Sequence, residues 1–109
     1  MAPQRFSTRV VGVSYRPCRA LLRHVPLGTP ALLVPAPDHP ADAHAIEVWL
    51  APPRATPWHA GYIGRGVAAR LAPAIASGVR YQGRVVAVRK RGHAPTGLTI
   101  TVAAQTHER

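Results

Sequence analysis

Acidic residues, lysine and cysteine are all scarce in this chain of 109 residues. Lys90 is the only lysine and Cys18 the only cysteine. A lone cysteine cannot form a disulfide within the chain, so we expect a reducing compartment, namely the cytoplasm. No apolar run approaches the roughly 20 residues that a membrane-spanning helix requires. Residues Met1–Thr8 also lack the apolar centre of a signal peptide.

The shortage of acid leaves a large positive charge. The chain has 14 lysine and arginine residues against 4 acids, which gives a formal net charge of +10 at pH 7. Arginine carries a planar fork of donors that matches phosphate oxygens and stacks on rings. A codon usage biased toward arginine and alanine would give the same composition and serve only solubility. We nevertheless expect a polyanion as partner, with nucleic acid first and a nucleoid association in the cell.

The length and the apolar content indicate one compact domain. Hydrophobic residues make up 47% of the chain, which is enough to build a core. The 12 prolines and 9 glycines favour a loop-rich, mainly β protein over a helical bundle. We expect residues 9–104 to form the domain, with 1–8 as an N-terminal extension and 105–109 as a frayed tail.

Apolar periodicity predicts about six strands and one helix. Val67, Leu71 and Ile75 recur at helical spacing, which predicts a helix over Gly64–Ser77, with Gly78 suited to the left-handed position after it. A short helical stretch is expected over 18–24. The expected strands are 9–15, a buried run at 31–34, 45–50, 58–63, 81–88 and 98–102, with a cationic loop at 89–91 before the last. This order predicts a small, partly open barrel that resembles an OB fold, with the helix covering one opening.

Three of the 4 acids lie close together in the segment from Asp38 to Val48. Asp38 and Asp42 sit in a loop broken by proline, and Glu47 lies in the strand that follows. In so basic a chain, this clustering indicates one local negative spot. A turn aspartate that binds its own backbone after Pro40 would explain Asp42 equally simply.

Three segments together resemble the HIRAN domain, a small DNA-binding module. They are Val10-Val11-Gly12-Val13-Ser14-Tyr15, the loop and strand 37–48, and Gly61-Tyr62-Ile63 running into the helix. Their order and spacing are more specific than any one of them, and the likeness covers roughly residues 9–88. The resemblance implies an OB-like barrel that holds the free 3′ end of single-stranded DNA.

The resemblance places Asp42 on the acid that senses the terminal hydroxyl. An ionised carboxylate only accepts hydrogen bonds, so it suits a sugar hydroxyl and repels a phosphate. Tyr15 and Tyr62 are the candidate rings for base stacking, although both could be ordinary barrel tyrosines. Arginines could bind the phosphates, although each taken singly reads as a solvated surface residue; the set is Arg16, Arg65, Arg70 and Arg84.

This chain departs from the pattern of well-studied members. Ser14 stands where they carry a basic residue, Ala41 where they carry an aromatic, and His44 where they carry an amide. Tyr62 falls where a histidine can occur. One stacking surface is thus missing, and Trp49 or Trp58 are the candidates to replace it.

Two other functions remain open at this point. His39, Asp42 and His44 form a His-x-x-Asp-x-His pattern that could hold zinc or a first-row metal and polarise water for phosphodiester hydrolysis. Exposed tryptophans and proline-rich loops could instead serve a protein-interaction adaptor. The sequence holds no Gly-x-x-x-x-Gly-Lys phosphate loop. We expect a monomeric, non-catalytic module without a cofactor, which binds single-stranded DNA and works with a separately encoded helicase or nuclease.

Overall fold

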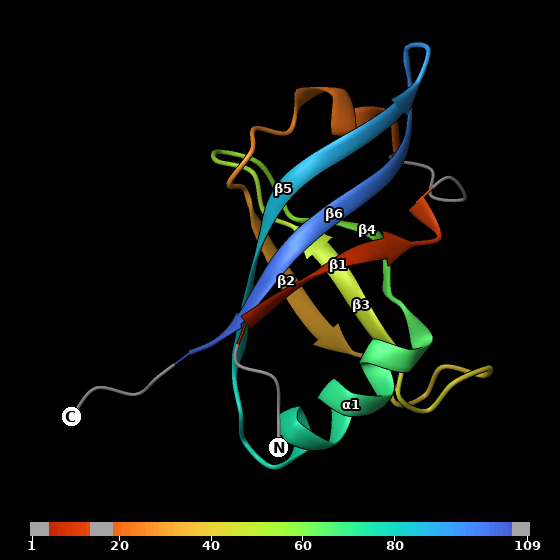
Figure 1. Cartoon of the computed structure of the whole chain (residues 1–109), viewed down its shortest axis with the longest axis vertical. Helices are drawn as coiled ribbons and strands as arrows, with labels where there is room; N and C mark the ends of the chain where they lie inside the picture. Colours follow the sequence, from red (N-terminus) through yellow and green to blue (C-terminus); the bar gives the residue numbers. More distant parts are fainter. Residues whose placement is uncertain (1–4, 14–18, 106–109) are drawn as a thin grey trace.

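The computed structural model describes residues 5–13 and 19–105. Six antiparallel strands close into a barrel in the order β1-β4-β3-β2-β5-β6, and α1 lies at one end of it (Figure 1). The strands are β1 (Arg5–Val11), β2 (Pro30–Pro35), β3 (Ile46–Leu50), β4 (Trp58–Ile63), β5 (Tyr81–Arg91) and β6 (Ala94–Ala104); the helices are the 3-10 helix η2 (Arg19–His24) and α1 (Arg65–Ala76). The predicted mainly β barrel with one helix is confirmed, and the barrel is closed.

Alternation along the strands builds the core. In β3, Ile46, Val48 and Leu50 are fully buried, while the intervening Glu47 and Trp49 are only half-buried. Strand β6 repeats the pattern with its own buried aliphatic residues, Leu98, Ile100 and Val102. A strand places successive side chains on opposite faces, so every strand has an inner and an outer set. The outer sets therefore form the surface on which a functional site must lie.

Strand β2 corrects the prediction of a buried run. Ala31 is buried, but Leu32 and Val34 are 44% and 39% exposed. Leu32 pairs with Trp49 and Val34 with Glu47 on the neighbouring strand β3. The run is apolar on both faces, yet only one face of a barrel strand reaches the core. Apolar side chains therefore stand on the outer face of β2.

Several predicted boundaries were wrong. Strand β1 begins at Arg5 and ends at Val11, whereas we expected a strand over 9–15, of which residues 14 and 15 lie outside the described residues. The expected cationic loop belongs to β5, because Lys90 pairs with Pro95 and Arg91 with Ala94 of β6. Pairing of the two long strands satisfies the backbone groups of this segment, which the run of like charges had suggested was a loop.

Helix α1 packs on the barrel through Ala68 and Leu71, both fully buried. Gly64 is its N-cap, and Gly78 follows the C-cap with a φ of 108°. The Gly78 N–H donates to the carbonyl of Ile75 at 3.0 Å, so the predicted left-handed end is confirmed. No helix of the described residues is long and apolar enough to cross a membrane.

A short seam between β1 and β4 closes the barrel. Its register joins Val10 to Ile63 and Val11 to Tyr62. Next to this seam, a Cβ on Gly61 would lie 2.5 Å from the carbonyl oxygen of Val11 and 2.7 Å from Cγ1 of Val10. Glycine at this position therefore allows the two strands to approach.

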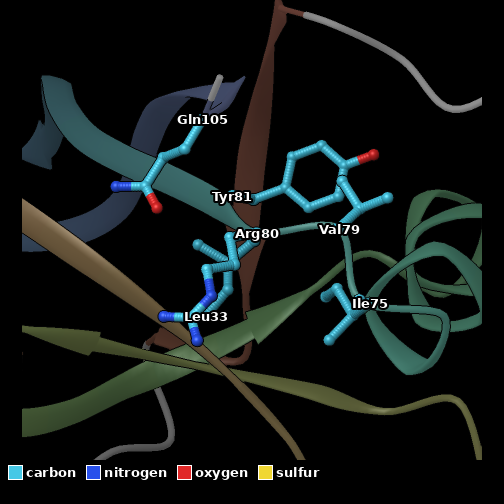
Figure 2. A pocket seen from close by; sticks show the side chains of 7 residues that line it. Leu33, Ile75, Val79, Arg80, Tyr81 and Gln105 are labelled. Carbon is cyan, nitrogen blue, oxygen red and sulfur yellow. The ribbon is translucent and has the colours of Figure 1, made fainter. Parts of the chain in front are cut away.

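A pocket of about 430 Å³ opens beside the C-terminal end of α1 (Figure 2). Leu33, Ile75, Arg80, Tyr81 and Gln105 contribute to its wall. The hydroxyl of Tyr81 is buried and has no hydrogen-bond partner among the described residues. Burial raises the pKa of this phenol above its ordinary value of 10.0.

Substitution of Gly61 by alanine should destabilise the fold by about 1–3 kcal/mol, because the new methyl group must displace backbone atoms of β1. The matched control is Gly66→Ala in the first turn of α1, where a Cβ meets nothing within 4 Å. Alanine there should stabilise the helix by up to about 1 kcal/mol. Urea unfolding measures both changes, and equal stability of the two variants would contradict the close approach at the seam.

Replacement of Tyr81 by phenylalanine should raise the free energy of unfolding by about 1 kcal/mol, since it removes a buried hydroxyl without a partner. The wild-type chain should lose stability as the pH rises above about 10.0, because the unfolded phenol ionises there before the folded one does. Tyr81→Phe should lack this part of the loss of stability at alkaline pH. Unfolding curves at neutral pH and just above pH 10 test both points, and a less stable variant would refute the assignment.

Candidate functional site

Tyr62 lies on the outer face of the barrel at the end of β4. It pairs with Val11 of β1 on one side and with Glu47 of β3 on the other. Residues directly opposite one another in antiparallel strands share a face, so these three side chains stand in one row. Val11 is 47% exposed, and Tyr62 and Glu47 are half-buried. The row therefore belongs to the outer surface.

Three further rings join Tyr62, and we call His39, Trp49, His59 and Tyr62 the ring cluster. The ring of His39, from the 36–45 loop, lies 5.4 Å from that of Tyr62 at an interplanar angle of 83°. The ring of His59 lies 5.0 Å from Tyr62 at 74°. On its far side, His59 stacks on Trp49 with centroids 5.5 Å apart and planes 7° apart. The cluster is thus a continuous series of rings across the outer faces of β4 and β3.

Hydrogen bonds fix the orientation of two of these rings. The indole N–H of Trp49 donates to Oε1 of Glu47 at 2.8 Å. Nε2 of His59 lies 3.0 Å from the carbonyl oxygen of Gly61. Because a carbonyl only accepts, Nε2 carries the proton in this contact. The rings are therefore held in place before any ligand arrives.

Asp42 closes a turn in the 36–45 loop. Its Oδ1 accepts the backbone N–H of His44 at 2.9 Å, and its own N–H donates to the carbonyl of His39 at 3.4 Å. The simple interpretation of Asp42 as a turn aspartate is therefore correct as far as Oδ1 is concerned. The same turn connects Asp42 to the residue whose ring packs on Tyr62.

Arg65, the first residue of α1, holds this loop. Its Nη2 donates to the carbonyl of Ala41 at 2.7 Å, and its Nε lies 3.6 Å from Oδ2 of Asp42. The Arg65 side chain is 74% exposed and that of Asp42 19%. An ion pair so exposed stabilises the fold by about 1 kcal/mol at most. Its main consequence is to bring a guanidinium and a carboxylate side by side at the surface.

A hollow of about 430 Å³ lies next to the ring cluster. Its wall includes His39 and Glu47 together with Asp38 and the prolines of the loop. Asp38, Asp42 and Glu47 are the acids of the described residues, so all of them stand around this side of the barrel. The predicted local negative spot is therefore present, and it borders the rings.

The structure brings together only part of the predicted site. Tyr62, Asp42 and Arg65 lie in one cluster, while Tyr15 and Arg16 fall outside the described residues. Arg70 follows Arg65 by five residues in α1, which places it roughly 140° around the helix. Arg84 lies on β5, which pairs with β2 and β6, and its Nη1 donates to the carbonyl of Gly28 at 2.9 Å. Among the described residues, neither arginine forms a ring contact or ion pair with the cluster.

The proposed metal ligands do not converge. Among the residues that the structure describes, no three histidine, cysteine, aspartate or glutamate side chains are placed to hold a metal ion. Nδ1 of His39 accepts the N–H of Ala41 at 3.1 Å, and the His39 ring faces Tyr62. Asp42 faces Arg65, and His44 is exposed. The placement of these three side chains therefore does not support the alternative of a metal site at His39, Asp42 and His44.

Sequence reasoning missed His39 and His59 as members of the site and left Trp49 as an alternative. A signal was available for Trp49, which stands at an outward position of β3 by period two. His59 lies three residues before Tyr62, so alternation along β4 does not predict that they share a face. The pairing of Trp49 with His59 across the strands follows from the register, which shifts at Val48 and Trp49. No periodicity could indicate the contact of the loop residue His39 with Tyr62.

Comparison with known proteins gives a family and a fold. Residues 3–105 match the HIRAN domain family. The crystal structure of the HIRAN domain of human HLTF is similar with a TM-score of 0.67 and 17% identity, covering 93% of this chain and 74% of that one. A structure of a protein from Lactobacillus plantarum is similar with a TM-score of 0.67 and 22% identity, covering 92% of this chain and 95% of that one. No curated protein matches the chain.

Proposed function

The chain belongs to the HIRAN domain family, and from this membership and the geometry of the ring cluster we propose that it binds nucleic acid without a catalytic step. The ligand that we propose in detail is the free end of a single DNA strand that carries a 3′-hydroxyl. Three groups would carry the recognition: the rings for bases, Arg65 for a phosphate and Asp42 for the terminal hydroxyl.

The rings supply the base contacts of the proposed site. Tyr62 is half-buried, and it is held on two sides by near-perpendicular contacts with His39 and His59. A base that stacks on a fixed aromatic ring gains about 1–3 kcal/mol whatever its sequence. Ala41 removes the aromatic that the family resemblance implies beside the acid. His39, two residues earlier, puts a ring in contact with Tyr62 and supports stacking here.

The pairing of Asp42 with Arg65 is the observation that carries the proposal. A strand end presents a hydroxyl donor and, one sugar away, an anionic phosphate. The site offers a guanidinium donor that is 74% exposed and, 3.6 Å from it, a carboxylate acceptor on a side chain that is 19% exposed. Planar guanidinium groups suit phosphate oxygens, and carboxylates suit hydroxyls. The pair therefore matches the two groups of a strand end in kind.

Asp42 keeps acceptor capacity after it has formed its turn. Two carboxylate oxygens offer about four lone-pair sites, and the His44 N–H occupies one of them. The contact of Oδ2 with Nε of Arg65, at 3.6 Å, is longer than a hydrogen bond. A sugar hydroxyl can therefore donate to Oδ2, whereas a terminal phosphate would meet the negative charge of Asp42 and would be disfavoured.

Asp42→Asn should weaken strands that end in a 3′-hydroxyl by about tenfold or more, because a hydrogen bond to a charged group is lost. The affinity for strands that end in a 3′-phosphate should fall less, or should rise, because the repulsion between the Asp42 carboxylate and the terminal phosphate disappears. Asparagine can still accept the His44 N–H through its carbonyl oxygen, so the turn should survive. Fluorescence anisotropy with the two kinds of end measures the difference.

The matched control is Asp38→Asn, which removes the same charge from the same exposed loop. Asp38→Asn should change the affinity for hydroxyl-ended and phosphate-ended strands by the same factor, because it alters only the general electrostatic field of the protein. If Asp42→Asn and Asp38→Asn gave the same ratio of hydroxyl-end to phosphate-end affinity, the role of Asp42 as hydroxyl acceptor would be refuted.

Tyr62→Leu should reduce the affinity for a single strand by about 1–3 kcal/mol, since the stacking surface is lost. Tyr62→Phe keeps the ring and should bind within a few-fold of the wild-type chain. Both variants should retain the hydroxyl-over-phosphate preference set by Asp42. Equal losses for leucine and phenylalanine would mean that the hydroxyl of Tyr62, and not its ring, makes the contact.

The proposed role also implies a working context. A domain that holds a strand end can present it to an enzyme, so we propose that a separately encoded helicase or nuclease uses the bound DNA. This chain would supply the recognition and the partner the chemistry. Affinity should fall steeply with salt, as expected for phosphate contacts.

A further inference from the structure

The barrel carries a second charged surface besides the one that holds the ring cluster and the acids. In the closed order β1-β4-β3-β2-β5-β6, strand β6 stands across the barrel from β3, with β1 and β5 as its neighbours. The ring cluster and the acids lie on the side of β3, β4 and the 36–45 loop. The outer faces of β6 and β5, together with the Arg5–Arg9 part of β1, form a second surface, which adjoins the ring cluster where Val11 pairs with Tyr62.

Arginine dominates this second surface. On β1, the exposed side chains of Arg5 and Arg9 alternate with the half-buried Phe6 and Thr8. Arg5 pairs with Ala103 of β6, and Arg9 pairs with Thr99. From the other side, Arg84 of β5 pairs with Thr101, which shares its face of β6 with Thr99. Cationic side chains thus flank a row of hydroxyls on both sides.

Arg89 lies flat across the same face. It pairs with Gly97, and its guanidinium occupies the space that a Cβ on Gly97 would need. Its Nη1 donates to Oγ1 of Thr99, directly opposite Arg9. We call the surface formed by Arg5, Arg9, Arg84 and Arg89 the arginine wall. Glycine at position 97 lets the Arg89 side chain rest on β6.

Among the described residues, no carboxylate forms an ion pair with the arginine wall. Within residues 5–13 and 19–105, Arg84 and Arg89 contact only neutral acceptors, the carbonyl of Gly28 and the hydroxyl of Thr99. These two contacts orient the guanidinium groups and leave their charge in place. Arg5 and Arg9 are exposed. The wall therefore keeps a positive charge of full strength.

The dimensions of the wall favour an extended anion. Arg5 and Arg9 stand about 13 Å apart along β1, at roughly 3.3 Å per residue. This spacing exceeds the screening length of about 8–10 Å at physiological salt, so the two charges do not act as one site. A single phosphate could contact only one of them. A chain of phosphates could contact all four arginines at once, assisted by threonine hydroxyls, which commonly bind phosphate oxygens.

We propose that the arginine wall is a second nucleic-acid contact, which binds the phosphate backbone of duplex DNA independently of sequence and of strand ends. The guanidinium groups of the surface can bind phosphate oxygens. Between them, the described residues of β6 present threonine hydroxyls and no aromatic ring on which a base could stack. The centre of the surface on β6 lies across the barrel from β3, so one molecule can hold a strand end and a duplex segment at the same time. It goes beyond the proposed end-binding function and does not depend on it.

The test uses a dumbbell duplex, in which hairpin loops close both ends and no free 3′ end exists. The wild-type chain should bind it at about 50 mM salt and lose affinity steeply toward 200 mM. The double variant Arg5→Gln/Arg9→Gln removes two exposed arginines and should lower the slope of log affinity against log salt by about 2. Circular dichroism melting verifies that the variant is folded.

The matched control is Arg23→Gln/Arg54→Gln, which removes the same charge from exposed positions of η2 and of the loop before β4. It should leave the salt slope within about half a unit of the wild-type value. An equal drop in slope for both double variants would overturn the proposal, because the wall would then contribute only net charge. Failure of the wild-type chain to bind the dumbbell, or preference for anionic lipid vesicles over it, would also overturn it.

Two cross-checks separate this proposal from the proposed function. Asp42→Asn should change binding of the dumbbell no more than Asp38→Asn does, since Asp42 contacts Arg65 and the 36–45 loop and not the arginine wall. The double variant of the wall should keep the preference for hydroxyl-ended over phosphate-ended single strands. If that preference survives while the dumbbell fails to bind, the wall proposal falls and the end-binding function stands.

Discussion

A seam between two strands fixes both the barrel and the candidate site. Strands β1 and β4 join through Val10 with Ile63 and Val11 with Tyr62, and they can approach because Gly61 has no side chain to meet the Val11 carbonyl. Tyr62 belongs to the seam, so the contact that closes the barrel also sets the ring on its outer face. Three residues later Arg65 starts α1 and holds the loop of Asp42. The strand pairing that closes the barrel, the ring of Tyr62 and the arginine that holds the Asp42 loop thus lie within a few residues of one another in the sequence.

The closed barrel also explains how one small basic domain can carry two different surfaces. Its core uses the inner faces of all strands, so the outer faces are free to differ from wall to wall. One surface collects rings and acids beside the guanidinium of Arg65, and the surface centred on β6 collects arginines and hydroxyls. If acidic and basic side chains were mixed evenly over the surface, the protein would have neither a local carboxylate acceptor for a hydroxyl nor an extended cationic face. The separation of charge across the barrel is therefore the feature on which the functional proposals rest.

The fold could be predicted from the sequence more fully than the site. Alternation in Ile46–Leu50 and the helical spacing of Val67, Leu71 and Ile75 gave the elements and their order, because local periodicity reports burial directly. The ends of the strands were harder to predict. The run of charge at 89–91 suggested a loop, but Lys90 pairs with Pro95 and β5 continues through this segment. The contact of His39 with Tyr62 was beyond reach, because a loop ring meets a strand ring only through the tertiary fold.

The family resemblance predicted roles for Asp42 and Tyr62, while alternation in β3 alone would have suggested Trp49. Charge counting gave the basic character of the chain and its cluster of acids. It did not reveal that Arg84 stands on the wall opposite Tyr62, since strand order around the barrel is not written in any local pattern. A single sequence thus predicts which residues are candidates better than it predicts which of them meet.

The most direct test of the account is an NMR titration of the isotope-labelled chain with a short single strand ending in a 3′-hydroxyl. The account predicts that the largest amide shifts fall on Tyr62, His39, Asp42 and Arg65, and that they shrink when the strand ends in a 3′-phosphate. Unchanged amides at these four residues, with shifts confined to the pocket beside Tyr81 or with no shifts at all, would contradict it.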